Sequence, residues 1–149
     1  MVDRSFADEN NAARAELSEL VAGLDERSFK CPVGSGWTIS TCLCHLAFWD
    51  HRVLFLLDEW GRTGRLETSR LSSQSVNSIN QAVNAISQAV PGAAAAKLAL
   101  DAALAVDSLL AAISDELISQ LVSAGLERYL KRSLHRREHL QKMKEALHG

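Results

Sequence analysis

The stretch Gly36-Trp37-Thr38-Ile39-Ser40-Thr41-Cys42-Leu43-Cys44-His45 marks the start of a long helix, and the rest of the fold can be worked out from it. Thr38 is a good N-cap, because its hydroxyl oxygen can accept a hydrogen bond from a backbone N–H of the first helical turn. The helix is predicted to reach Trp60, with Gly61 just past its end as a stop signal. His45 lies near the beginning of this helix.

The remainder of the chain is predicted to be helical as well, because prolines are few and alternating β-branched runs are almost absent. Arg27 to Gly36 is predicted to be a loop, and the Pro91-Gly92 pair separates two later helices. The other substantial helices are expected from about Ser5 to Val21, Ala93 to Ile113 and Leu126 to Leu147, with a short helix from about Gln74 to Val90. Four substantial helices in 149 residues predict an all-α single domain, residues 1–149, folded as a four-helix bundle.

The composition argues against several classes of function. The formal net charge of -2 and the pI near 6.2 show no excess of basic residues of the kind that nucleic-acid-binding proteins have. The longest apolar run, Ala93 to Ile113, contains charged residues that would each cost roughly 2.5–3.5 kcal/mol inside a bilayer, so we expect no membrane span. Cysteines without disulfide-scaffold spacing, and an N-terminus without a signal-peptide pattern, predict a cytoplasmic protein with reduced thiols.

Three histidines carry the chemistry that the sequence suggests. His135 and His139 are four apart in Leu134-His135-Arg136-Arg137-Glu138-His139-Leu140, so their imidazoles are neighbours on one helix surface and can grip a single ion. His45 on a facing helix would complete a tripod with an open coordination position, as in catalytic metal sites. Imidazole suits zinc, nickel, copper and iron, so the donor type alone does not choose the metal.

Two alternatives stay open for the pair His135 and His139. On a wheel of the last predicted helix, the apolar residues, Leu130 and Leu134 among them, centre roughly 90° or more from the histidines. Either this helix is buried on two sides, with Leu130 and Leu134 at a homodimer contact, or the histidine pair faces solvent. For His45 the alternative is a buried histidine with a structural role only.

Two motifs together resemble a known family. The first is Gly36-Trp37-Thr38-Ile39-Ser40 followed by Leu43-Cys44-His45-Leu46 and Trp49-Asp50, and the second is Ser133-Leu134-His135-Arg136-Arg137-Glu138-His139-Leu140. They resemble the second and final helices of the DinB-like superfamily, which includes the metal-binding domain of mycothiol-dependent maleylpyruvate isomerase. The resemblance spans nearly the whole chain. It implies a four-helix bundle with an up-down-down-up course and a divalent metal, most simply zinc or nickel, held by His45, His135 and His139.

The resemblance also implies a small-molecule reaction at that metal. The expected enzyme is a metal-dependent transferase, isomerase or hydrolase that attacks an electrophile with a metal-bound thiolate or hydroxide, the thiolate coming from a low-molecular-weight thiol. Trp49, Arg52 and Asn80 are candidate pocket residues, with Arg52 as an anchor for an anionic group. Glu138 or Asp50 is a candidate carboxylate for holding a ligand imidazole by its second nitrogen. The competing hypothesis is a non-catalytic dimeric helical bundle that binds a small molecule or a protein partner.

Overall fold

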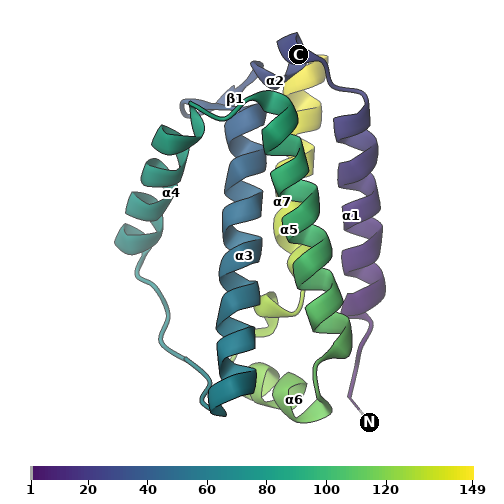
Figure 1. The fold of residues 1–149 in the computed structure, drawn as a ribbon, viewed down its shortest axis with the longest axis vertical. Coiled ribbons are helices and arrows are strands. Elements are labelled where there is room, and N and C mark those ends of the chain that lie inside the picture. Colours follow the sequence, from purple (N-terminus) through teal and green to yellow (C-terminus); the bar gives the residue numbers. More distant parts are fainter. Residues whose placement is uncertain (1) are drawn as a thin grey trace.

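The computed structural model describes residues 2–149, which are mostly helical (Figure 1). Strands β1 (Pro32–Gly34) and β2 (Trp37–Thr38) pair antiparallel in a two-stranded sheet. The helices are α1 (Phe6–Ala22), α2 (Glu26–Phe29), α3 (Ile39–Thr63), α4 (Ser73–Ser87), α5 (Gly92–Ala112), α6 (Asp115–Ser123), the 3-10 turn η1 (Glu127–Tyr129) and α7 (Arg132–His148). The predicted all-α class is confirmed.

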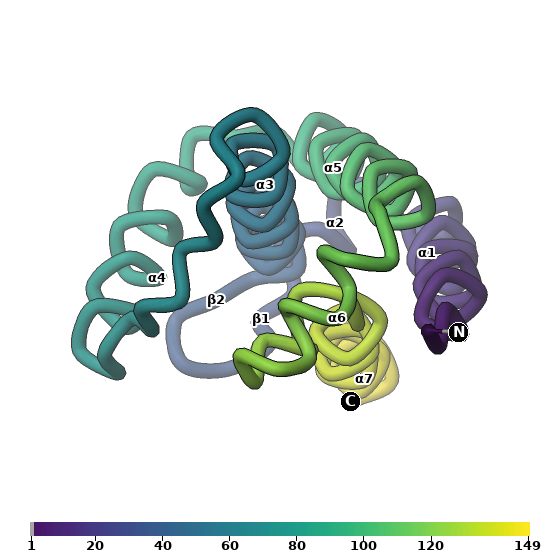
Figure 2. The backbone as a smooth tube through the Cα atoms, turned by 90° about the horizontal axis from the view of Figure 1, so that it is seen from below, coloured from purple at the N-terminus to yellow at the C-terminus, as the bar shows by residue number. Residues whose placement is uncertain are grey.

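Four long helices, α1, α3, α5 and α7, lie side by side and enclose the core (Figure 1). The end-on view in Figure 2 shows them as a ring, in which α5 contacts α3 and α1, and α7 contacts α1 and α3. Helix α4 stands outside the ring and packs on α3, while α6 lies across the lower end of the bundle. None of the helices within residues 2–149 combines the length and apolar character that crossing a membrane requires.

Helix α3 begins where the sequence predicted but ends later. The Thr38 hydroxyl accepts a hydrogen bond from the Thr41 backbone N–H at 3.2 Å, and the Thr41 hydroxyl accepts one from the Thr38 N–H at 2.9 Å. The predicted end at Trp60 is wrong, because the helix continues through Gly61. Gly64 caps it instead, with a φ of 71° that favours glycine because a Cβ would crowd the backbone there.

The connections contain more regular structure than predicted. Part of α2 and all of β1 fall within the segment from Arg27 to Gly36 that was expected to be an irregular loop. The predicted break at Pro91-Gly92 is confirmed, since Pro91 directly precedes α5 and Gly92 begins it. A Cβ added at Gly92 would overlap the Phe29 ring, so glycine at this position lets α2 pack closely against the start of α5.

The last helix begins at Arg132, and its predicted start at Leu126 is wrong. Asn10 on α1 holds the junction: its Nδ2 donates to the Leu130 carbonyl at 2.8 Å, and its Oδ1 accepts from the Ser133 N–H at 2.9 Å. Leu130 is a core residue, 3% exposed, so it cannot contribute to the predicted dimer surface, whereas Leu134 is 47% exposed. The predicted helical wheel therefore combined residues from two different elements.

The core consists of two apolar clusters with a polar layer between them. Along α3, Leu43 belongs to the cluster near the β-hairpin, Asp50 lies midway, and Leu57 belongs to the cluster near α6. Each of the four long helices contributes a deeply buried polar side chain to this layer, namely Asn10, Asp50, Asp107 and Arg136. This polar layer lies at the height where α3 and α7 present their histidines to each other.

Candidate metal centre

His45 on α3 and the pair His135 and His139 on α7 converge on one point. The Nε2 atom of His45 lies 3.1 Å from the Nε2 atom of His135 and 3.1 Å from that of His139. The ligand-capable atoms of all three residues lie within 4.8 Å of one another, and His45 is buried while the other two are half-buried. The structure thus brings together the three histidines singled out in the sequence, in an arrangement that could bind a metal ion.

The burial of α7 on two sides explains why the histidines lie away from its apolar residues. One side faces the bundle interior through Arg132, Ser133, Arg136, Leu140 and Met143. The adjacent side carries His135 and His139 against His45 of α3. The histidine pair therefore packs against the chain itself, and α3 supplies the second covering surface.

The two Nε2 separations that involve His45 fit a divalent cation better than they fit hydrogen bonding. A neutral imidazole carries one N–H, so His45 Nε2 can donate to only one of its two close neighbours. Zinc–nitrogen bonds of about 2.0–2.1 Å place ligand nitrogens about 3.3 Å apart in a tetrahedral site and about 2.9 Å apart in an octahedral one. The observed 3.1 Å lies between these values. A cation would use all three lone pairs at once.

Burial keeps the three imidazoles neutral, which is the form that binds metals. It lowers the pKa of His45 from 6.5 to about 4, with smaller contributions from the charges of His139 and Lys142. Burial also lowers the pKa of His139 to about 4, and Lys142 adds to that effect. The pKa of His135 falls furthest, to about 2, because burial acts together with the Arg132 charge. At neutral pH the three imidazoles therefore need to release few protons before they can bind an ion.

The lowered pKa values predict that the metal-free protein loses stability in mild acid. Between pH 6.5 and about pH 4 the unfolded chain binds protons at these histidines that the folded triad does not bind. The free energy of unfolding therefore decreases as the pH is lowered through that window. Urea unfolding of chelator-treated protein at pH 7.5, 6 and 5 measures the slope. His135→Gln should flatten it; an equal slope in both proteins would contradict the assigned burial.

The outer nitrogens of the triad differ in their surroundings. His139 Nδ1 lies 3.5 Å from the Cys42 thiol sulfur, whereas Nδ1 of His45 and of His135 are buried without a hydrogen-bond partner among residues 2–149. The Trp37 ring packs edge-on against His45, with ring centroids 5.3 Å apart. Burial raises the pKa of Cys42 to about 12, so in the metal-free protein its thiol stays protonated next to His139.

The Cys42 contact predicts a measurable effect on metal affinity. When Nε2 of His139 binds an ion, Nδ1 carries the proton and can donate it to Cys42 Sγ, which fixes the ring orientation. Cys42→Ala should weaken zinc binding about tenfold in a competition titration with a chromogenic chelator. Cys44→Ala is the matched control, because Cys44 is also buried on α3 but makes no contact with the triad within the described chain. Equal losses in both variants would contradict the assigned role.

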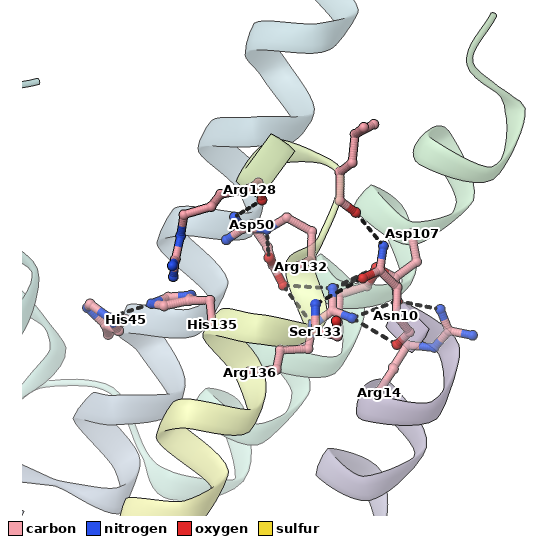
Figure 3. A network of polar contacts seen from close by, with 12 residues as sticks. Asn10, Arg14, His45, Asp50, Asp107, Arg128, Arg132, Ser133, His135 and Arg136 are labelled. Carbon is pink, nitrogen blue, oxygen red and sulfur yellow. Dashed lines mark hydrogen bonds and ion pairs between the residues drawn. The ribbon is translucent and has the colours of Figure 1, made fainter. Parts of the chain in front are cut away.

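A buried ionic network holds α7 in the rotation that presents the histidines (Figure 3). Arg136 donates to Asp107 through both terminal nitrogens, at 2.8 and 2.7 Å, and to Asp50 at 3.2 Å. Arg132, one turn earlier, donates to Asp50 at 2.8 Å. Asp50 was predicted to hold a ligand imidazole, and this is wrong because both its oxygens are taken by arginines. It positions the ligands through α7 instead.

Of the three predicted pocket residues, two lie at the triad. Trp49 and Asn80 line a cavity of about 410 Å³ together with all three histidines, and Trp49 Nε1 donates to Asn80 Oδ1 at 2.8 Å. Arg52 does not line this cavity; its guanidinium stacks over the Trp49 ring, 5.7 Å from the centroid. A second cavity of about 660 Å³ borders His45 and His139 and is lined by Trp37, Asn77 and Gln81 among others.

Sequence reasoning missed the ionic network and the part that Trp37 plays. Arg136 and Asp107 are 29 positions apart and carry no motif, so only the folded bundle, in which both side chains reach the interior, shows that they pair. Trp37 precedes the helix start in the quoted stretch and was used only as a marker of that start. No regular spacing in the sequence links Trp37 to His45, because the β-hairpin, and not the periodicity of a helix, places the two rings side by side.

Comparison with known families agrees with this geometry. The family model of the mycothiol maleylpyruvate isomerase N-terminal domain matches residues 11–137, most of the chain. The chain belongs to this family. The matched range includes His45 and His135 and stops just before His139. The resemblance to DinB-like proteins noted from the sequence is therefore confirmed. Neither a curated protein nor a solved structure gives a significant match.

Proposed function

We propose that this protein is a metal-dependent enzyme of the DinB-like superfamily that acts on a small electrophile. The convergence of three neutral Nε2 atoms on one point carries this proposal. His45, His135 and His139 would hold a divalent ion, with zinc or nickel the best matches to three imidazole donors. A divalent ion held there supplies Lewis acidity, which lowers the pKa of a bound thiol or water into the neutral range.

We also propose that the bundle is one domain with the up-down-down-up course of the superfamily. In Figure 1 the chain enters α1 at the lower end, passes down α3 and α5, and returns upward through α7. Helix α4 supports this assignment, because it runs back up outside the ring and so lets α3 and α5 run in the same direction. The two helices that carry the histidines then run antiparallel to each other.

The remaining residues of the site would bind and orient the substrate. Trp37 and Trp49 offer apolar surface on the two sides of His45, since Trp37 borders the larger cavity and Trp49 the smaller. Cavities of about 410 and 660 Å³ lie within the size range of small-molecule sites. Helix α4 closes the outer wall, and its Asn77 and Asn80 supply polar contacts.

The experiment that tests catalysis pairs thiols with electrophiles on metal-loaded protein. Mycothiol, bacillithiol and cysteine are each incubated with a panel of halogenated, epoxide and unsaturated acid electrophiles, and free thiol and product mass are followed. Turnover that disappears in His135→Ala and persists in His51→Ala would support the proposal. Catalysis would be contradicted if metal-loaded protein turned over none of these pairs and also hydrolysed none of the electrophiles without a thiol. Metal binding would be unaffected by that result.

A further inference from the structure

Two cavities meet at the histidine triad, and the same residues line both. The larger, about 660 Å³, lies between the β-hairpin and α4, and the smaller, about 410 Å³, is bordered by Arg128. His45, Asn80, His139 and Lys142 border both cavities. A ligand that approaches the triad from either side therefore meets the Asn80 amide and the Lys142 ammonium group.

The Asn80 amide has a fixed orientation. Tryptophan Nε1 is a donor only, so the Asn80 atom that lies 2.8 Å from Trp49 Nε1 must be the oxygen. The Nδ2 group is consequently turned away from Trp49. Asn80 lies close enough to His45 to act on the pKa of that imidazole, but no hydrogen bond of good geometry engages Nδ2 within residues 2–149. Since Asn80 lines both cavities, its two N–H donors are available to a ligand next to the triad.

The charged groups around the smaller cavity leave an excess of positive charge. Arg132 is paired with Asp50 and does not contribute to this excess. Arg128 makes no ion pair within the described chain, and Figure 3 shows its guanidinium extending toward the His135 ring. Lys142 has one carboxylate nearby, Glu138, at 3.9 Å, which is the outer limit of an ion pair. Neutral imidazoles add no negative charge that would balance Arg128.

We propose that Arg128, Lys142 and Asn80 form a subsite for the oxyanion group of a small molecule, a carboxylate or a phosphate, bound next to the triad. This inference rests on the proposed function for the ion beside it, but the three residues are in place without the ion. Guanidinium and amide donors bind oxyanions through charge-assisted hydrogen bonds, and Lys142 adds a mobile charge. The subsite would select anionic substrates over neutral ones of the same shape.

Isothermal titration on the full chain tests the subsite, with succinate, inorganic phosphate and neutral succinamide as probes. Metal content and circular dichroism are measured on the same samples of metal-free and nickel-loaded protein. Succinate or phosphate should bind and succinamide should not; which anion binds more tightly identifies the group. Arg128→Gln and Lys142→Gln should each weaken binding about tenfold. Asn80→Asp, which keeps the acceptor for Trp49 but replaces the free donor with a carboxylate oxygen, should abolish it.

The control is Lys144→Gln, an exposed lysine on the same helix that borders neither cavity. Equal binding of succinamide and succinate, or equal losses in Lys142→Gln and Lys144→Gln, would overturn the subsite. If no metal binds but succinate still binds in a way that Arg128→Gln weakens, the subsite stands and the proposed function fails. If metal binds and neither anion does, the subsite fails alone.

Discussion

Replacing Asp107 with asparagine should destabilise the protein by about 3–5 kcal/mol, the loss typical of breaking a buried ion pair on one side. Asp107 accepts hydrogen bonds from Arg136 through both carboxylate oxygens and from Arg14 at 2.8 Å. Asparagine would turn two N–H donors toward arginines that have only donors to offer. The buried Arg136 side chain, 0% exposed, would then share Asp50 with Arg132 as its remaining anionic partner in the described chain.

Urea unfolding followed by circular dichroism measures this loss, and Asp101→Asn is the matched control. Asp101 lies on the same helix, is paired with Lys97 and is 61% exposed, so its replacement should cost less than about 1 kcal/mol. If Asp107→Asn is too unstable to purify while Asp101→Asn is normal, the ranking is still established by expression and solubility. Similar stabilities for the two variants would show that the polar layer does not hold the bundle together.

Zinc should stabilise the folded protein strongly, because it would tie α3 to α7 through residues that are 90 positions apart. At a free zinc concentration a thousand times the dissociation constant, the free energy of unfolding should rise by about 4 kcal/mol. For a chain of this size that corresponds to a rise in melting temperature of about 10 °C. Differential scanning calorimetry with zinc buffered by a weak chelator, compared with chelator alone, measures the shift.

His139→Ala should lose most of this zinc-dependent rise, since two imidazoles remain of the three. His51→Ala should keep all of it, because His51 also lies on α3 but stacks on Phe55 away from the triad. The metal-free forms of both variants should melt close to the metal-free parent, which shows that folding is retained. A zinc-dependent rise of the same size in His139→Ala would remove that residue from the site.

Local signals in the sequence were enough for the helix class and for most helix starts, and tertiary contacts decided the rest. The capping residue Thr38 and the Pro91-Gly92 break have mechanisms that act within a few residues, so both were predicted correctly. The end of α3 and the start of α7 were not, because each depended on a choice that local sequence left open. Two glycines could have stopped α3, and Asn10, on another helix, fixes the beginning of α7.

The three histidines could be found from the sequence because two of them share the i, i+4 spacing of one helix face. What the sequence could not show was why that face is covered. Arg136 looks like a surface residue by type, yet it is buried with two aspartates and turns α7 so that its neighbour His135 faces α3. Likewise, Arg52 was chosen as an anion anchor from its position on α3. The arginine that lines the cavity without an ion-pair partner among residues 2–149 is instead Arg128, which lies outside any α-helix.

Metal binding by the three histidines is tested by the metal content of the untagged protein, purified without added metal and analysed beside His45→Ala. We expect about one zinc, nickel or other divalent ion per chain in the parent protein, and its loss in the variant with the helical fold retained. Absence of bound metal in the parent protein, even after reloading with zinc, nickel or iron, would contradict it. So would an equal metal content in His45→Ala.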